Sequence, residues 1–492
     1  MSMISFRFFI FTATLVLLYY VCPRRARWFI LLAGSTMFIV AGSSWKLYLV
    51  FAAQVLLAYA GAGLLRRYPD WAKPICAVVV GLEIAALVGM KESAFFIRNV
   101  NYLMTLLGKP VQLGYLNWAA PLAMSYYTLM LVSYVVDVYK GKIEAERNPL
   151  RLLLYAGFFP QMMSGPITRY SETAASLWEG HRFDYETACF GLQRFLWGLF
   201  KKMVLSERLA VLVDTIYNGG LEGTWTPTGV YVWVGAIAYT LQLYTDFSGG
   251  MDIVLGTAEL FGVKLPENFR TPFFSTSMAE VWRRWHITLS FWFRDYVYFP
   301  LGGSRVDARW KHIRNLFVVW LCTGFWHGGN YRWIFWGLAT FAVIAGGILL
   351  KPLFEKLTAL LHVNTEAASW TVLRRIRTFF LFVIVFSVQP AASLMSALHM
   401  WKNAFVWNPW VLMDGSLLQL GLDWREMAIL IFGLLLLFVI SNYQQQGSVR
   451  VMISRQNLVC RWILWLALFA VVVVFGRYGE GYNPADFIYG GF

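Results

Sequence analysis

Apolar residues occur along the chain in long runs, which short stretches containing charge, glycine or proline separate. These runs approach the ~20 apolar residues that a helix needs to span a bilayer. Examples are residues 8–21, 28–40, 47–65, 75–90 and 427–440. The pattern over the whole length predicts roughly ten to thirteen membrane segments, and therefore an all-α polytopic membrane protein.

Composition and charge agree with this interpretation. Hydrophobic residues make up 58% of the 492 positions and charged residues 14%, against about 25% charged in an ordinary soluble domain. The net charge of +15 would suit a nucleic-acid-binding protein, but the basic residues fall mostly in short loops between apolar runs. The positive-inside rule explains such loops. Residues 22–27 and 66–73 are therefore predicted to be cytoplasmic, with the N-terminus outside.

The first apolar run predicts a retained helix, because only Arg7 precedes it and no small-residue cleavage site follows. The sequence has no internal repeat and no long polar linker, which predicts a single integral membrane domain over residues 1–492. The five cysteines are scattered, without the spacing of a disulfide framework or a Cys-x-x-Cys metal site.

Glycine, proline and charge interrupt the apolar pattern in the middle of the chain, at residues 157–170, 242–253 and 266–314. Irregular backbone at membrane depth must be buried in protein or line a watery cavity. The central region, about residues 116–350, is therefore predicted to hold the functional site, and the flanking helices its scaffold.

A histidine at position 327 lies among apolar and aromatic residues. It lies 13 positions after Arg314, and a helix of that length covers about 20 Å of a ~30 Å hydrocarbon core. Gly328 and Gly329 then permit a bend before a second apolar run, residues 333–350. An ionisable residue at that depth indicates function, and imidazole can serve as a general base. The alternative is a neutral histidine that bridges two helices by hydrogen bonds.

A second histidine, His286, lies in the basic segment 281–314, which contains seven basic and two acidic residues. Helical spacing predicts one helix through this histidine, with Trp282 on the same face and Arg283 and Arg294 on an adjacent face. So charged a helix cannot span lipid, and it is predicted to lie at the cytoplasmic face.

Two other chemistries have less support in the sequence. Zinc needs three or four convergent ligands, and Cys322 is a poor additional candidate, so no metal is expected. Ser304 follows two glycines, but a G-x-S-x-G nucleophile elbow is absent. Direct transfer of a group from donor to acceptor is therefore favoured over a covalent enzyme intermediate.

Two long motifs resemble signatures of the membrane-bound O-acyltransferases. Within this family they resemble the bacterial branch, which comprises alginate O-acetylases, peptidoglycan O-acetyltransferases and the teichoic acid D-alanyl transferase. PENFRTPFFSTSMAEVWRRWHITLSFWFRDYVYFPLGG (266–303) resembles the first signature and contains His286. GFWHGGNYRWIFWG (324–337) resembles the second, in which His327 stands at the catalytic position. Residues 158–170, 198–210 and 244–253 and the terminal FIYGGF are also similar to family sequences.

This resemblance implies a fold and a mechanism. The fold is a ring of tilted transmembrane helices around a thin central region, where a tunnel joins a cytoplasmic donor funnel to an outward acceptor funnel. His327 would activate an acceptor hydroxyl for attack on a thioester carbonyl. His286 would position the donor or form part of the tunnel wall.

The basic segment 281–314 would suit a phosphorylated donor, such as acetyl-coenzyme A or the phosphopantetheine of an acyl carrier protein. The donor is a substrate, and no bound cofactor is expected. The candidate donor-binding residues are Arg283, Arg284 and Arg294. The alternative is that these arginines only follow the positive-inside rule.

Four further residues are candidates for the tunnel or for acceptor binding. Trp326 and Asn330 flank His327 in the second motif. Asp246 and Asp252 lie in the interrupted stretch at 242–253. These aspartates either bind acceptor hydroxyls or pair with buried arginines such as Arg332, and the pairing is favoured.

The stretch YFPLGGSR (298–305) resembles the polysaccharide O-acetylases more than the D-alanyl transferase. We therefore expect O-acetylation of an exported polysaccharide or cell-wall glycan, directly or through an extracytoplasmic esterase-like partner, in the bacterial plasma membrane. D-alanylation of teichoic acid is the enzymatic alternative. A transporter or channel with a gating histidine is the alternative of another class, but the inverted repeat typical of transporters is absent.

Overall fold

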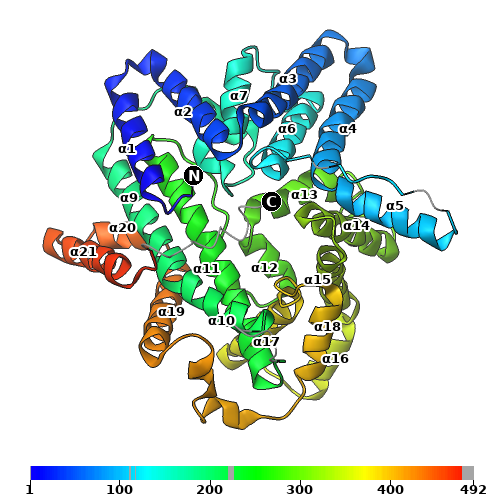
Figure 1. The fold of residues 1–492 in the computed structure, drawn as a ribbon, viewed down its shortest axis with the longest axis vertical. Coiled ribbons are helices and arrows are strands. Elements are labelled where there is room, and N and C mark those ends of the chain that lie inside the picture. The colour runs from blue at the N-terminus through cyan, green and yellow to red at the C-terminus, as the bar shows by residue number, and fades with distance from the viewer. Residues whose placement is uncertain (1, 110–111, 117, 220–225, 479–492) are drawn as a thin grey trace. The chain divides into compact units, whose positions relative to one another are not determined.

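The computed structural model describes residues 2–109, 112–116, 118–219 and 226–478, which form helices joined by turns and short loops (Figure 1). Within these ranges no β-strand occurs, and the only β-type pairing is an isolated bridge between Phe269 and Trp285. The prediction of an all-α protein is confirmed. The terminal FIYGGF motif lies outside the described residues.

The chain contains two compact units. The single membrane domain over residues 1–492 stays a prediction. The first unit comprises the described residues up to Phe195 and Gly250–Pro266, and the second comprises Leu196–Gly249 and the described residues from Glu267 onward. The division falls within two helices, α9 (Tyr185–Leu199) and α11 (Val230–Leu260). Both candidate histidines belong to the second unit.

The first unit has the helices α1 (Phe6–Val21), α2 (Arg27–Gly42), α3 (Trp45–Arg67), α4 (Ala72–Lys91), α5 (Ser93–Leu106), α6 (Met124–Tyr139), α7 (Pro149–Gly157) and α8 (Tyr170–Trp178). Helices α3, α4 and α6 pack against one another. Buried polar groups join them, because Gln54 donates to Glu83 Oε2 at 3.0 Å and accepts from the Tyr127 hydroxyl at 2.7 Å. Such bonds compensate the cost of burying polar side chains among apolar helices.

The second unit has the helices α10 (Glu207–Tyr217), α12 (Met278–Arg284), α13 (Ile287–Phe293), α14 (Arg309–His327), α15 (Tyr331–Leu349), α16 (Lys351–Leu360), α17 (Ala368–Phe386), α18 (Leu394–Asn403), α19 (Trp424–Gln444), α20 (Val449–Ser454) and α21 (Leu458–Phe475). Helices α14 and α15 lie side by side, and α15 also packs against α12 and α17 (Figure 1). The second motif forms the end of α14 and the beginning of α15, and aromatic residues of α12 and α17 pack on its Trp336.

Five of the described helical segments are long and apolar enough to cross a membrane. They are Trp45–Arg67, Pro69–Lys91, Tyr331–Leu349, Trp424–Gln444 and Leu458–Phe475. This number is lower than the ten to thirteen predicted, because several apolar runs form shorter helices. Helices α1, α2 and α6, for example, have 16 residues each, fewer than the ~20 that span a bilayer without tilt or thinning.

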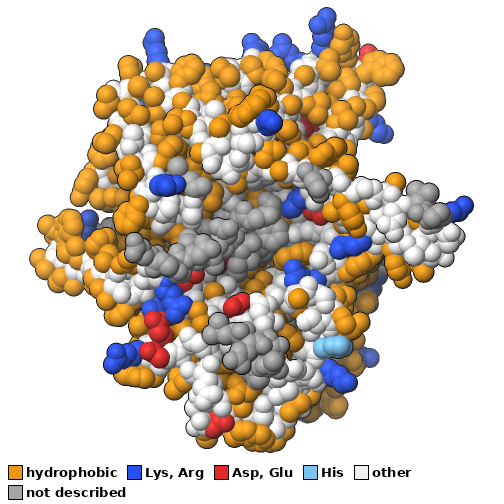
Figure 2. Space-filling model, in the orientation of Figure 1, with side chains coloured by type: hydrophobic (Ala, Val, Ile, Leu, Met, Phe, Trp, Pro, Cys, Tyr) orange, Lys and Arg blue, Asp and Glu red, His pale blue; other side chains and the backbone are white. Residues whose placement is uncertain are grey.

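Hydrophobic side chains cover much of the visible surface (Figure 2). Helix α21 is an extreme case, since Leu458, Trp462 and Leu466 are each more than half exposed. Exposure of so large an apolar surface to water would be unfavourable, whereas its contact with lipid hydrocarbon is not. The exposed faces therefore match the membrane location that the sequence predicts.

The predicted continuous helix through His286 is wrong. Helix α12 ends at Arg284, Trp285 is extended, and α13 begins at Ile287. His286 itself has φ 45° and ψ 51°, in the left-handed region. Two short helices therefore replace one, and the histidine lies at the break between them.

Candidate active site

Helices α14 and α15 form a tight hairpin that positions His327 at its turn. Helix α14 ends at His327 because Gly328 adopts φ 153°, which residues with a side chain rarely adopt. The two backbones approach closely further down the hairpin: a Cβ on Gly337 would lie 2.4 Å from the carbonyl oxygen of Trp320. The helix, the Gly-Gly break and the second helix predicted from the sequence are all confirmed.

His327 is buried, and its imidazole has a defined hydrogen bond. Nδ1 lies 2.7 Å from the carbonyl oxygen of Thr323, one turn earlier in α14. A carbonyl oxygen can only accept, so Nδ1 carries the proton, and in the neutral ring Nε2 holds the basic lone pair. Trp326, Trp333 and Trp336 surround the ring with centroids at 4.9, 5.5 and 4.8 Å.

His286 is held by a loop 18 residues earlier in the chain. Asn268 accepts from the Ile287 amide through its backbone oxygen (3.0 Å), and its Oδ1 accepts from the Thr288 amide and hydroxyl, each at 3.0 Å. His286 Nδ1 lies 3.4 Å from the same Oδ1. A left-handed non-glycine residue costs about 1–3 kcal/mol, and this set of bonds maintains it.

The two histidines share an aromatic neighbour. The ring centroid of Trp326 lies 6.2 Å from that of His286 and 4.9 Å from that of His327. Phe247 packs on His286 at 4.8 Å. Complete burial, assisted by the nearby His327, lowers the pKa of His286 well below its usual value, so this ring is neutral near pH 7. The structure thus brings together two motifs that are distant in sequence.

The three predicted donor-binding arginines have different surroundings. Arg283 is exposed. Arg284 forms an ion pair with Glu280 in the same helix, with 2.7 Å between Nη2 and Oε1. Arg294 forms an ion pair with its neighbour Asp295 at 2.7 Å. Of the three, only Arg284 takes part in a larger polar cluster, which includes arginines that the sequence analysis missed.

The two candidate aspartates form ion pairs, though not with Arg332. Asp246 Oδ1 lies 2.7 Å from Lys202 Nζ, and Asp252 Oδ1 lies 2.9 Å from Arg194 Nε. Arg332 instead donates to the backbone oxygen of Ala391. Lys202 is fully buried. The sequence could have suggested that it has a buried partner, because Lys201 and Lys202 lie in an otherwise apolar stretch.

The remaining candidate, Asn330, begins the second helix of the hairpin. Its Oδ1 accepts from the backbone amide of Arg332 at 3.0 Å, which is the usual arrangement of an N-cap. In the described part of the chain, no three His, Cys, Asp or Glu side chains gather as a metal site would require. The chemistry that the described residues offer is that of a buried imidazole with a fixed tautomer, which suits proton transfer.

Comparison with known sequences identifies the family. The family profile described as MBOAT, membrane-bound O-acyltransferase family, matches residues 145–389, which include both histidines. A probable alginate O-acetylase of Pseudomonas putida is 31% identical over 420 residues, which cover 84% of this chain and 81% of that protein. This chain belongs to the membrane-bound O-acyltransferase family.

Two other proteins are similar over shorter regions. The peptidoglycan O-acetyltransferase of Helicobacter pylori is 32% identical over 289 residues, 53% of each chain. The teichoic acid D-alanyltransferase of Bacillus subtilis is 27% identical over 231 residues, 45% of this chain and 57% of that one. Together with the apolar helices, family membership makes this chain a multi-pass membrane O-acyltransferase.

Proposed function

We propose that this O-acyltransferase moves an acetyl group from a cytoplasmic thioester donor to hydroxyl groups of an exported polysaccharide, with His327 as the general base. The single observation that carries the proposal is the 2.7 Å contact between Nδ1 of His327 and the Thr323 carbonyl oxygen, which leaves Nε2 as the basic atom. A relative that matches over most of the chain is named as a probable alginate O-acetylase, which favours acetyl and polysaccharide over other substrates.

The reaction needs one proton to move twice. The Nε2 atom of His327 takes the proton of the acceptor hydroxyl as the hydroxyl oxygen forms a bond to the thioester carbonyl carbon. The tetrahedral intermediate then collapses, the carbon–sulfur bond breaks, and the imidazolium returns the proton to the leaving thiolate. The products are the O-acetyl ester and the free thiol, so no redox partner or metal is needed for balance.

His286 has a positioning role in this proposal. Its left-handed backbone and its bonds to Asn268 place a neutral imidazole against Trp326, which in turn packs on His327. We infer that His286 and Trp326 form part of the wall of a tunnel, along which the thioester reaches the base. Asp246 and Asp252, which form ion pairs, serve as structural groups rather than as acceptor ligands.

We also propose where and with what the enzyme works. The alternation of basic and charge-poor loops supports a bacterial plasma membrane location with the N-terminus outside. The donor is acetyl-coenzyme A or an acyl carrier protein. The acceptor is the exported glycan itself or an extracytoplasmic esterase-like partner that passes the acetyl group on.

The test compares two histidines of the same helix. Purified protein in nanodiscs is given radiolabelled acetyl-coenzyme A and candidate glycans, and labelled ester is counted. His327→Asn, which cannot accept a proton at neutral pH, should lower the rate by about 10²- to 10⁴-fold. His312→Asn, also in α14 but packed near Tyr298, is the control and should retain the wild-type rate. His286→Asn should keep partial activity.

Three results would contradict the proposal. Substantial acyl transfer by His327→Asn would make this histidine a structural hydrogen-bonding residue. Transfer of D-alanyl but not acetyl groups by the wild type would favour the teichoic acid reaction. Solute uptake without any acyl transfer would support a transporter instead.

A further inference from the structure

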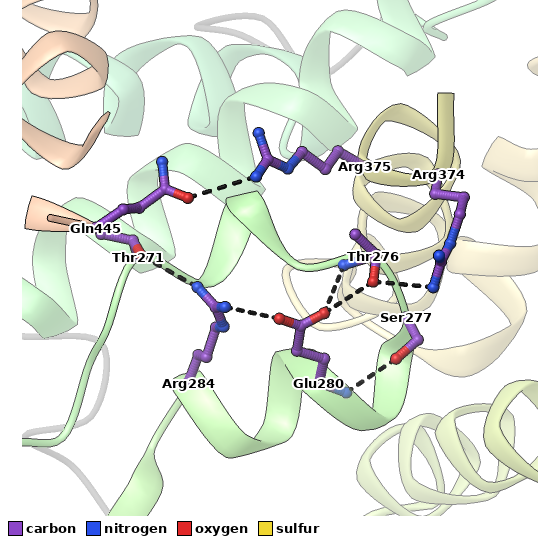
Figure 3. Close-up of polar contacts among 8 residues, drawn as sticks. All are labelled: Thr271, Thr276, Ser277, Glu280, Arg284, Arg374, Arg375 and Gln445. Carbon is purple, nitrogen blue, oxygen red and sulfur yellow. Dashed lines mark hydrogen bonds and ion pairs between the residues drawn. The ribbon is translucent and has the colours of Figure 1, made fainter. Parts of the chain in front are cut away.

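Arg374 and Arg377, from the first part of α17, both contact the loop that precedes α12, and Figure 3 shows the contact of Arg374. Arg374 Nη2 donates to the hydroxyl of Thr276 at 3.1 Å. Arg377 Nη2 donates to the backbone oxygen of the same threonine at 2.9 Å. Two guanidinium groups, 98 and 101 positions further along the chain, therefore contact a single residue.

Glu280 connects this loop to α12 and to Arg284. Its Oε2 accepts from the amide and the hydroxyl of Thr276 at 2.8 and 3.0 Å, and its Oε1 pairs with Arg284 Nη2 at 2.7 Å. Arg284 Nη1 also donates to the Thr271 hydroxyl at 3.3 Å. Partial burial alone would raise the pKa of Glu280, but the bonds from Thr276 and the charge of Arg284 outweigh it and lower that pKa. The carboxylate is thus ionised and holds the cluster in place.

The cluster has more positive than negative charge. It contains the guanidinium groups of Arg284, Arg374 and Arg377, and among the described residues Glu280 is the one carboxylate that pairs with any of them. Their other acceptors are neutral hydroxyl and carbonyl oxygens.

This convergence is unfavourable in the absence of an anion. Like charges at such short range repel one another. The positive-inside rule explains why arginines occur at this face. It does not explain why Arg374 and Arg377, two flexible side chains, both turn to Thr276. A bound anion would offset the repulsion and use guanidinium N–H groups that the neutral acceptors leave available.

Helix α12 connects the cluster to the histidines. It has seven residues and is therefore about 10 Å long. Arg284 is its last residue, and His286 follows after one intervening position. On the same helix, Trp282 lies 5.9 Å from Trp336, whose ring lies 4.8 Å from His327. A ligand with an anionic group at the cluster could thus extend along α12 to the two histidines.

We propose that Arg284, Arg374 and Arg377, together with Thr276, bind a phosphate group of the acyl donor. The inference rests on the proposed function, in which the donor is a phosphorylated thioester. Guanidinium groups bind phosphate through paired N–H bonds. In coenzyme A and phosphopantetheine the phosphate and the thioester lie at opposite ends of a long arm, so holding the phosphate here would direct the reactive carbon toward His327.

The proposed site differs from the one that the sequence suggested. Arg284 belongs to both. Arg283 and Arg294 are replaced by Arg374 and Arg377, which lie outside both motifs but are brought to Thr276 by the packing of α17 against α12.

The experiment measures binding and catalysis separately, in the full chain reconstituted in phosphatidylcholine nanodiscs. Arg374→Gln and Arg377→Gln are compared with wild type for equilibrium binding of coenzyme A and of pantetheine, which has the same thiol arm but no phosphate. Each charge-assisted bond lost should weaken coenzyme A binding by about tenfold or more and leave pantetheine binding unchanged. The KM for acetyl-coenzyme A should rise by a similar factor at constant kcat.

Two further samples control for folding and for general charge. Arg305→Gln removes an exposed arginine that makes no hydrogen bond or ion pair to any described residue, and it should bind coenzyme A as wild type does. Arg374→Lys keeps the charge but not the planar fork, so it should recover only part of the affinity. Unchanged thermal unfolding of the Gln variants establishes that they are folded.

The outcomes separate this inference from the proposed function. Equal loss of coenzyme A and pantetheine binding, or no loss of either, would overturn the phosphate site. Loss of phosphatidylglycerol binding in the variants, with coenzyme A binding intact, would assign the arginines to a lipid headgroup and also overturn it. Arginine-dependent coenzyme A binding by a wild type that transfers no acetyl group to any glycan would support the phosphate site while refuting the proposed acetylation of a polysaccharide.

Discussion

The buried group of Lys202, Asp246 and Glu207 leads to a quantitative prediction about stability. Lys202 Nζ lies 2.7 Å from Asp246 Oδ1 and 2.7 Å from Glu207 Oε1, and the three side chains are only 2%, 1% and 4% exposed. One cation thus faces two carboxylates. Lys202→Met would leave both carboxylates buried without the cation that they share. Removing one partner of a buried ion pair costs about 3–5 kcal/mol of unfolding free energy.

The unequal charge of the group predicts an order among variants. Asp246→Asn removes one of the two carboxylate charges and leaves Lys202 paired with Glu207, so it should cost less, about 1–3 kcal/mol for the weakened hydrogen bond. Lys311→Met is the surface control. Its Nζ lies 2.8 Å from Asp307 Oδ1, but that carboxylate is 74% exposed, and exposed pairs contribute about 0–1 kcal/mol.

The assay is unfolding of the purified variants in one detergent, followed by tryptophan fluorescence against denaturant, together with their abundance in membranes. The expected order of destabilisation is Lys202→Met, then Asp246→Asn, then Lys311→Met. If Lys202→Met is no more harmful than Lys311→Met, or if Asp246→Asn costs as much as Lys202→Met, then the buried lysine does not compensate two ionised carboxylates and the reasoning is refuted.

Two further predictions concern helix packing and topology. Gly337→Ala would place a Cβ 2.4 Å from the Trp320 carbonyl oxygen and should destabilise the α14–α15 hairpin by about 1–3 kcal/mol. Gly346→Ala is the control: no atom lies within 4 Å of its Cβ, so it should be neutral or stabilise α15. If the thermal unfolding midpoints of both variants shift by the same amount, the packing argument is wrong. Arg25→Cys and Arg309→Cys, in an otherwise cysteine-free chain, should resist impermeant thiol reagents in intact cells, because both positions are predicted to be cytoplasmic. Rapid labelling of either would reverse the assigned orientation.

The hairpin at His327 could be predicted from the sequence because its determinants are local. An apolar run, two consecutive glycines and a second apolar run define helix, break and helix, and the structure has them as α14 and α15. The role of Gly328 follows from its missing Cβ alone. The all-α membrane class follows in the same way, since it depends on composition and on the length of apolar runs.

The surroundings of His286 could not be predicted, because they depend on contacts between distant residues. Helical spacing favours an unbroken helix over 281–294, and no glycine or proline marks the break. Asn268 maintains the left-handed conformation of His286, because its oxygen atoms accept hydrogen bonds from the backbone amides of Ile287 and Thr288. The helix propensity of each residue contributes only a few tenths of a kcal/mol. Several buried hydrogen bonds contribute more, so they can break a helix that the local sequence favours.

The contacts of charged residues that are distant in sequence were decided by tertiary structure, unlike local pairs such as Arg284 with Glu280. The sequence has 42 basic and 27 acidic residues, so composition allows many partners for each aspartate and arginine. Packing brings Lys202 to Asp246 across 44 positions and Arg374 to Thr276 across 98. Sequence patterns determine which residues are buried or lie at a helix end, but the electrostatic energy of a pair depends on a distance of a few ångströms, which only the folded chain sets.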